Sequence, residues 1–249
     1  MNGQIPDSGQ LDLFVHSRAV VLANDVIAAL LARDAVGAAE CLDRLRAEEP
    51  GHRVRKALET LYHTLAEWPL PSANPAEIAE AIRQLEADTH PAALAAMGDK
   101  ADQFMRPLWR DLAQAAKPHA YDAAFPQSYS APLHLRRGDA EAAAAAAQAV
   151  AHHDDNVDAL YWLAVARYRI DGLAACRISL MRLALLGPER LPEALSEIDD
   201  ALLNREWRAF HAACHWLDPE NHTVGAWFPA WHLVEHPGIR IDCGDSKTL

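Results

Sequence analysis

Three short polar corners recur at a nearly constant spacing between Leu133 and Pro219. The corners are Gly138-Asp139, Asp171-Gly172 and Asn204-Arg205, and each separates two apolar segments with helical spacing. Asp139 and Asp171 are 32 residues apart, and Asp171 and Asn204 are 33 residues apart. A period in the low thirties, with a helix–turn–helix in each period, is typical of stacked helical repeats. The spacing therefore predicts an all-α fold.

The residue types at the first corner explain why the chain would turn there. The Asp139 carboxylate can accept from the free N–H groups of Glu141 or Ala142, as a helix N-cap does. Gly138 can adopt the left-handed conformation that ends the preceding helix. The run that follows, residues 140–151, is rich in alanine, which forms helices well and presents a flat surface to a neighbouring helix.

The distance from a corner to the helix exit that follows it is also constant. It is 16 residues in three places, namely Asp139 to Asp155, Asp171 to Gly187, and Asp34 to Pro50. Asn156 or Asp155 is expected to cap the helix after the first exit, and Gly187-Pro188 is expected to stop the second. The same unit is therefore predicted near the N-terminus and in the C-terminal half.

This pattern resembles the tetratricopeptide repeat family over about half to two thirds of the chain. The matching residues of the clearest unit, about 159–188, are Trp162, Ala166, Tyr168 and Pro188. Those of the first unit, about 19–50, are Leu22, Ala38 or Ala39, Leu42 and Pro50. The resemblance implies a right-handed superhelix whose concave face binds peptides or partner proteins.

The first helices of successive units would line that concave face. In the C-terminal array they include the segment 157–170, so Tyr161, Tyr168 and Arg169 are the candidate partner contacts. The preferred hypothesis is a non-enzymatic interaction scaffold or adaptor that binds a protein or peptide partner and needs no cofactor. Self-association is left open, because repeat arrays with exposed apolar ends can pair.

Composition limits the classes of partner and of compartment. The formal net charge of −12 and the pI near 5.5 argue against nucleic acid and anionic membranes as partners. The four cysteines form no Cys-x-x-Cys pair, which favours reduced thiols in a cytoplasmic protein. Residues 1–10 do not resemble a signal peptide, and no apolar window is long enough for a membrane span. The alanine- and arginine-rich composition favours a bacterial source.

The proline-rich and irregular stretches suggest a domain plan. It comprises a flexible N-terminus (1–10), an N-terminal helical region (11–116), an irregular linker (117–132), a helical repeat array with a terminal capping helix (133–236) and a tail (237–249). In the N-terminal region, helices are expected over about 11–32, 35–48, 52–68, 75–88 and 91–116. A cluster of large rings near the C-terminus would cover the apolar end of the array.

A histidine-rich stretch near the C-terminus supports a different hypothesis. His211 and His215 are four residues apart, a spacing that brings two imidazoles to one helix face and is used by zinc sites. His232 and His236 flank Glu235 in a His-x-x-Glu-His order, in which Glu235 would activate a metal-bound water. The alternative is therefore a metal-binding protein or metal-dependent hydrolase that uses these four histidines.

Overall fold

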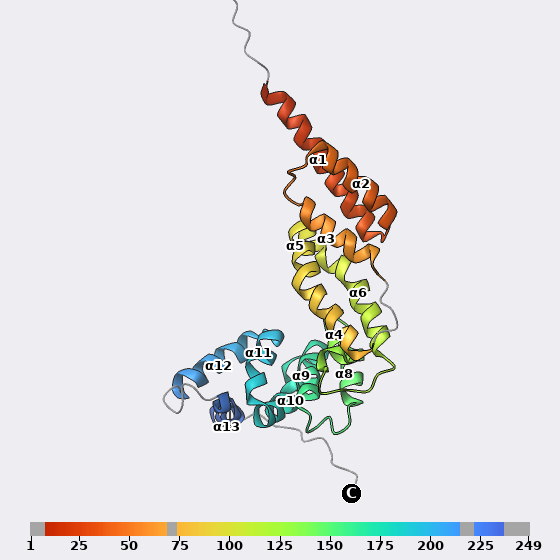
Figure 1. Cartoon of the computed structure of the whole chain (residues 1–249). Helices are drawn as coiled ribbons and strands as arrows, with labels where there is room; N and C mark the ends of the chain where they lie inside the picture. The colour runs from red at the N-terminus through yellow and green to blue at the C-terminus, as the bar shows by residue number, and fades with distance from the viewer. Residues whose placement is uncertain (1–7, 69–73, 215–221, 237–249) are drawn as a thin grey trace, which may run out of the picture. The chain divides into compact units, whose positions relative to one another are not determined.

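A computed structural model describes residues 8–68, 74–214 and 222–236 (Figure 1). Every regular element in these ranges is helical, which confirms the predicted all-α class. None of these helices has the length and apolar character needed to cross a membrane. The chain forms two compact units, Met1–Ala115 and Ala116–Leu249.

The first unit begins with a long antiparallel hairpin. Its elements are α1 (Ser8–Leu31), α2 (Ala35–Glu48), α3 (Arg55–Ala66), α4 (Pro75–Gln84), the π-helical turn η1 (Leu85–Thr89), α5 (His90–Met97), the 3-10 turn η2 (Gly98–Lys100) and α6 (Ala101–Ala116). Helices α1 and α2 pack along each other, and α3 packs on both of them (Figure 1). Helix α5 packs on α3.

Side-chain caps fix the starts of two of these helices. The Asp34 carboxylate accepts from the Gly37 N–H at 2.9 Å and starts α2. Asn74 and Glu77 form a complete capping box at the start of α4. The helix expected over 75–88 does not end there, because the π-helical turn carries it directly into α5. The helix expected over 91–116 is divided at Gly98, whose φ of 54° ends α5, whereas Pro107 lies inside α6.

The core of the first unit is mainly aliphatic, and it also includes the rings of Phe104 and Trp109. Its largest fully buried side chains are Leu30, Leu45, Leu58, Leu61, Ile78, Met105, Leu108 and Leu112. Polar contacts join its later elements: Trp68 Nε1 donates to Asp111 Oδ2 at 2.9 Å, and the hydroxyls of Thr64 and Thr89 lie 3.1 Å apart.

The second unit is built around one buried helix. Its elements are η3 (Pro126–Ser128), α7 (Ser130–Arg136), α8 (Ala140–Gln148), α9 (Val157–Asp171), α10 (Leu173–Leu186), η4 (Pro188–Arg190), α11 (Leu191–Ile198), α12 (Ala201–Cys214), η5 (His222–Trp227) and α13 (Phe228–Glu235). Helix α9 contacts α7, α8, α10 and α11, and every residue from Ala159 to Ala166 is buried. The alanines of α8 that face α9, such as Ala143 and Ala147, are fully buried.

The third predicted corner is wrong. Asn204 and Arg205 lie inside α12, and the chain turns five residues earlier, where Asp199 adopts φ 49°. Asp200 then caps α12 by accepting from the backbone N–H of Leu203 at 3.0 Å. The Asn204 side-chain amide donates to Asp199 Oδ1, so this polar side chain contacts the turn that precedes α12. The 33-residue spacing between the corners at Asp171 and Asn204 is therefore not a repeat of the structure.

The segment expected to be an irregular linker, 117–132, packs within the second unit. The Tyr129 ring stacks on Trp162 of α9 with centroids 5.8 Å apart, and the Tyr121 ring meets Trp162 edge-on at 5.9 Å. Tyr121 Oη also donates to Asp158 Oδ2 at 2.7 Å. Helix α7 begins at Ser130, three residues before the predicted start of the array.

Candidate functional site

A buried carboxylate in the second unit faces two imidazoles from the next helix. Glu206 lies on the apolar face of α12, between Leu203 and Phe210, which are also buried. His232 lies in α13, and His236 is the residue that directly follows the last residue of this helix, four positions further on. Helices α12 and α13 contact each other, so the three side chains meet at that contact.

The three polar groups are close together. His232 Nδ1 lies 2.6 Å from Glu206 Oε2, and His236 Nε2 lies 2.7 Å from Glu206 Oε1. The side chains of Glu206 and His232 are 6% and 7% exposed, whereas that of His236 is 38% exposed. The cluster is therefore closed toward the core and open at His236. It is the one group of at least three clustered metal-ligand side chains found among the described residues.

These separations are those of ion pairs when the imidazoles are protonated, but the N–H directions do not meet hydrogen-bond geometry. Neither oxygen of Glu206 has a hydrogen-bond donor in the described structure, and His232 Nδ1 is likewise without a partner of suitable geometry. Burial lowers the pKa of His232, although the Glu206 carboxylate opposes this effect. A buried carboxylate without donors is unfavourable unless a cation balances it.

The sequence predicted two of these three residues. His232 and His236 belong to the cluster, whereas His211 is exposed, with its ring centroid 4.3 Å from that of Trp207. His215 lies outside the described residues. Glu235, expected to activate water, is exposed and is not part of the cluster.

Glu206 was missed by the sequence reasoning, although a signal existed. Leu203, Glu206 and Phe210 stand at i, i+3 and i+7, so a single acidic residue interrupts the apolar face of an amphipathic helix. A glutamate at such a position is buried when the face is covered. Sequence spacing alone does not indicate that α13 covers it.

Aromatic rings surround the same helix contact. The centroid of the fully buried Phe210 ring lies within 6 Å of the ring centroids of Trp207, His211, Phe228 and Trp231. Trp227 is 67% exposed, and Trp216 lies outside the described residues. The described rings, other than Trp227, fill the space between α12 and α13.

The three predicted partner contacts already interact within the second unit. Tyr161 is 8% exposed, and the Arg190 guanidinium lies 4.9 Å from its ring centroid. Burial raises the pKa of Tyr161 to about 12. Tyr168 Oη donates to Asp200, and Arg169 donates to the Leu135 carbonyl and pairs with Glu197.

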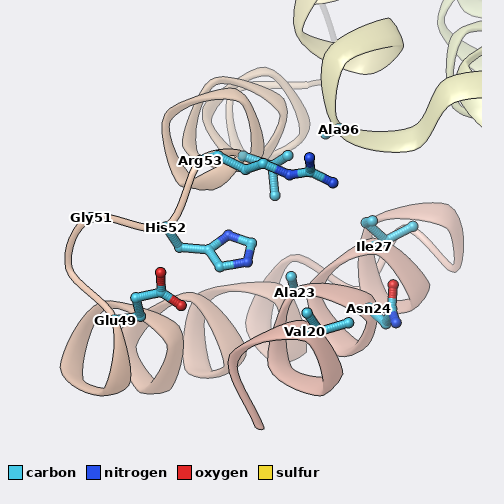
Figure 2. A pocket seen from close by; sticks show the side chains of 10 residues that line it. Val20, Ala23, Asn24, Ile27, Glu49, Gly51, His52, Arg53 and Ala96 are labelled. Carbon is cyan, nitrogen blue, oxygen red and sulfur yellow. The ribbon is translucent and has the colours of Figure 1, made fainter. Parts of the chain in front are cut away.

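The first unit contains a cleft between α1 and the turn that joins α2 to α3 (Figure 2). It has a volume of about 440 Å³, and Ala96 of α5 contributes to its wall. The α1 side consists of Val20, Ala23, Asn24 and Ile27. Val20 is 51% exposed, so the cleft presents apolar surface to solvent.

Polar groups without partners line the other side of the cleft. They are the side chains of Glu49, His52 and Arg53. Glu49 Oε2 and His52 Nδ1 are buried atoms without a hydrogen-bond partner in the described structure. Figure 2 shows the Glu49 carboxylate beneath the His52 ring and the Arg53 side chain extending above the α1 residues. The Arg53 guanidinium is exposed and forms no ion pair with any described residue.

Comparison with known proteins found no matching family model, no matching curated protein and no matching solved structure.

Proposed function

We propose that this protein is a non-enzymatic interaction protein that binds an extended segment of a partner in the cleft of its N-terminal unit. The observation that carries the proposal is the cleft itself, which combines exposed apolar surface on α1 with polar groups that lack partners. Its volume of about 440 Å³ falls within the range of ligand sites, roughly 300–1,000 Å³.

The arrangement of α1, α2 and α3 supports the proposal. Two helices form an antiparallel hairpin, and the first helix of the next hairpin packs on both of them. In a tetratricopeptide-like solenoid the first helices of adjacent hairpins form one wall of a concave face. The cleft between α1 and the start of α3 corresponds to that wall. We extend the solenoid arrangement to this protein as part of the same proposal.

The chemistry of the cleft indicates what kind of segment would bind. Val20 and Ile27 offer an apolar floor for an aliphatic side chain of the partner. The exposed Asn24 amide can both donate to and accept from an extended peptide backbone. Arg53 can pair with a carboxylate of the partner, since no described residue occupies its guanidinium. The occupant we propose is therefore a segment with one aliphatic anchor and one carboxylate.

The C-terminal candidates are a weaker basis for partner binding. Tyr161 is buried beneath Arg190, and the polar ends of Tyr168 and Arg169 are engaged within the unit. A side chain with all its polar atoms engaged must break those contacts before it binds a partner. The proposal therefore assigns the partner to the first unit.

A display library of random peptides, selected on the full chain, tests this proposal. Selected peptides are synthesised with a fluorophore, and their dissociation constants are measured by fluorescence anisotropy. We expect Val20→Asp and Arg53→Ala each to weaken binding about tenfold or more, which corresponds to about 1.4 kcal/mol.

Matched controls lie on α2, outside the cleft. Val36 is 72% exposed, and the Arg44 side chain is 67% exposed. Val36→Asp and Arg44→Ala should leave the affinity unchanged within about twofold, because neither touches the cleft. Equal weakening by both pairs of variants, or selected peptides indifferent to all four, would contradict the proposal.

A further inference from the structure

We infer that Glu206, His232 and His236 form a binding site for one divalent first-row transition-metal ion, with zinc as the best probe. The inference concerns the second unit and is independent of the cleft in the first. Its starting point is a carboxylate, nine-tenths buried, whose two oxygens both lack hydrogen-bond donors. Both oxygens are aimed at imidazole nitrogens.

The ligand set suits such an ion. One carboxylate oxygen and two neutral imidazole nitrogens are ligands that zinc accepts, and two histidines with one carboxylate also bind iron. The ion would balance the carboxylate charge without requiring either imidazole to be protonated. The competing explanation is a pair of imidazolium–carboxylate ion pairs, which the separations of 2.6 and 2.7 Å permit when the imidazoles are protonated.

The distances require only a small adjustment. Ligand atoms from the three side chains all lie within 4.8 Å of one another. With metal–ligand bonds of about 2.05 Å, the ligand atoms of a tetrahedral zinc are about 3.3 Å apart. With Oε2 of Glu206 as the ligand oxygen, its 2.6 Å contact with His232 Nδ1 would therefore open by roughly 0.7 Å, within reach of small side-chain rotations.

The groups around the three ligands indicate from which side an ion would enter and which further ligand it would bind. His232 and Arg177 both line a small apolar cavity, and the positive charge of Arg177 disfavours a bound cation. His236, 38% exposed, leaves the opposite side open to solvent, so a water could complete the coordination. The net charge of −12 favours the approach of cations. A bound ion would join α13 to α12.

Zinc binding to the full chain tests the inference. Protein purified without a chelator is analysed by elemental mass spectrometry, and metal-stripped protein is then titrated with Zn²⁺ against a competing chromophoric chelator. The wild type should bind about one zinc per chain. Loss of an outer-sphere partner of a zinc ligand already weakens binding about 10–100-fold. Glu206→Gln and His236→Gln, which remove ligands, should therefore each weaken it at least about tenfold.

His211→Asn is the matched control, because His211 lies on the same helix, is exposed and is outside the cluster. It should change zinc affinity by less than about twofold. Its melting temperature should rise with zinc as that of the wild type does, whereas His236→Gln should show little rise. Should Glu206→Gln fail to fold, the half-exposed His236 provides the deciding variant. Folded wild type that binds no zinc, or equal weakening in His211→Asn, would overturn the inference.

Discussion

The phenol of Tyr168 donates a 3.0 Å hydrogen bond to Oδ2 of Asp200, and so ties the end of α9 to the start of α12. The other oxygen of the same carboxylate accepts from the backbone N–H groups of Leu202 and Leu203 at 2.9 and 3.0 Å. Asp200 is thus both a helix cap and the link between two helices. Because α12 carries Glu206, this link also positions the carboxylate of the proposed metal site.

Replacement of Asp200 by alanine should destabilise the second unit. Loss of an N-cap costs about 1 kcal/mol, and the lost hydrogen bond to Tyr168 adds a fraction of that, since the group is largely solvated. Urea denaturation followed by circular dichroism measures the loss. Tyr168→Phe removes only the link and should lose clearly less than Asp200→Ala. Equal losses in the two variants would show that the cap contributes nothing.

The Asp200 cap should weaken in acid. The Leu203 N–H is the main cause that lowers the pKa of Asp200 in the folded state, and the Tyr168 hydroxyl and the Leu202 N–H also contribute. A carboxyl whose folded pKa lies below its unfolded value contributes stability above the unfolded pKa and loses it as pH falls through the folded pKa. The ordinary value is 3.8, so the loss begins near pH 4 and is complete below the folded pKa.

Asp200→Asn gives the comparison that isolates this effect, because asparagine keeps an acceptor for the cap but carries no charge. The urea midpoint of the wild type should exceed that of the variant at pH 6, and the difference should shrink as the pH falls below 4. A difference that stays constant from pH 6 to pH 3 would contradict the assignment.

Phe210 is expected to be the most sensitive position in the aromatic cluster. It is fully buried and packs against Trp207, Phe228 and Trp231. Phe210→Ala should cost about 3–5 kcal/mol, because it removes a large buried ring and leaves a cavity. The free energy of unfolding, from urea denaturation, is the measurement. Val234→Ala, at a position 76% exposed on α13, should stay within about 0.5 kcal/mol of the wild type.

Gly187 is required by packing. Its φ of −146° is open to any residue, but a Cβ there would overlap Cγ1 of Val157. Gly187→Ala should therefore cost about 1–3 kcal/mol by overpacking. The same substitution should cost less in a Val157→Ala background, because the overlapping methyl is gone. A double-mutant cycle with no coupling between the two positions would contradict this account.

Local rules predicted much of the helix punctuation. Asp139 accepts from the Ala142 N–H and Asn156 caps α9, both as expected from residue type. Gly138, with φ 81°, ends its helix in the predicted way. These features depend on neighbours within four residues, so the sequence contains the information that determines them.

The corner predicted at Asn204 lies at Asp199 instead, where φ is 49°, and the Asn204 side chain, inside α12, hydrogen-bonds back to Asp199. The other features that sequence reasoning missed depend on residues far apart in the chain. Glu206 becomes a candidate ligand only because α13 folds back onto α12. The cleft beside Arg53 arises from the packing of α1 against the α2–α3 turn, and no sequence spacing predicts it.

Hydrogen–deuterium exchange of the full chain, with and without a selected peptide, tests the proposed function most directly. Slower exchange is expected over residues 20–27 and 49–54, which contain most of the residues that line the cleft, with no change over α12 and α13. Protection over α9, where Tyr161, Tyr168 and Arg169 lie, with none in the first unit, would contradict it and return the partner site to the C-terminal unit.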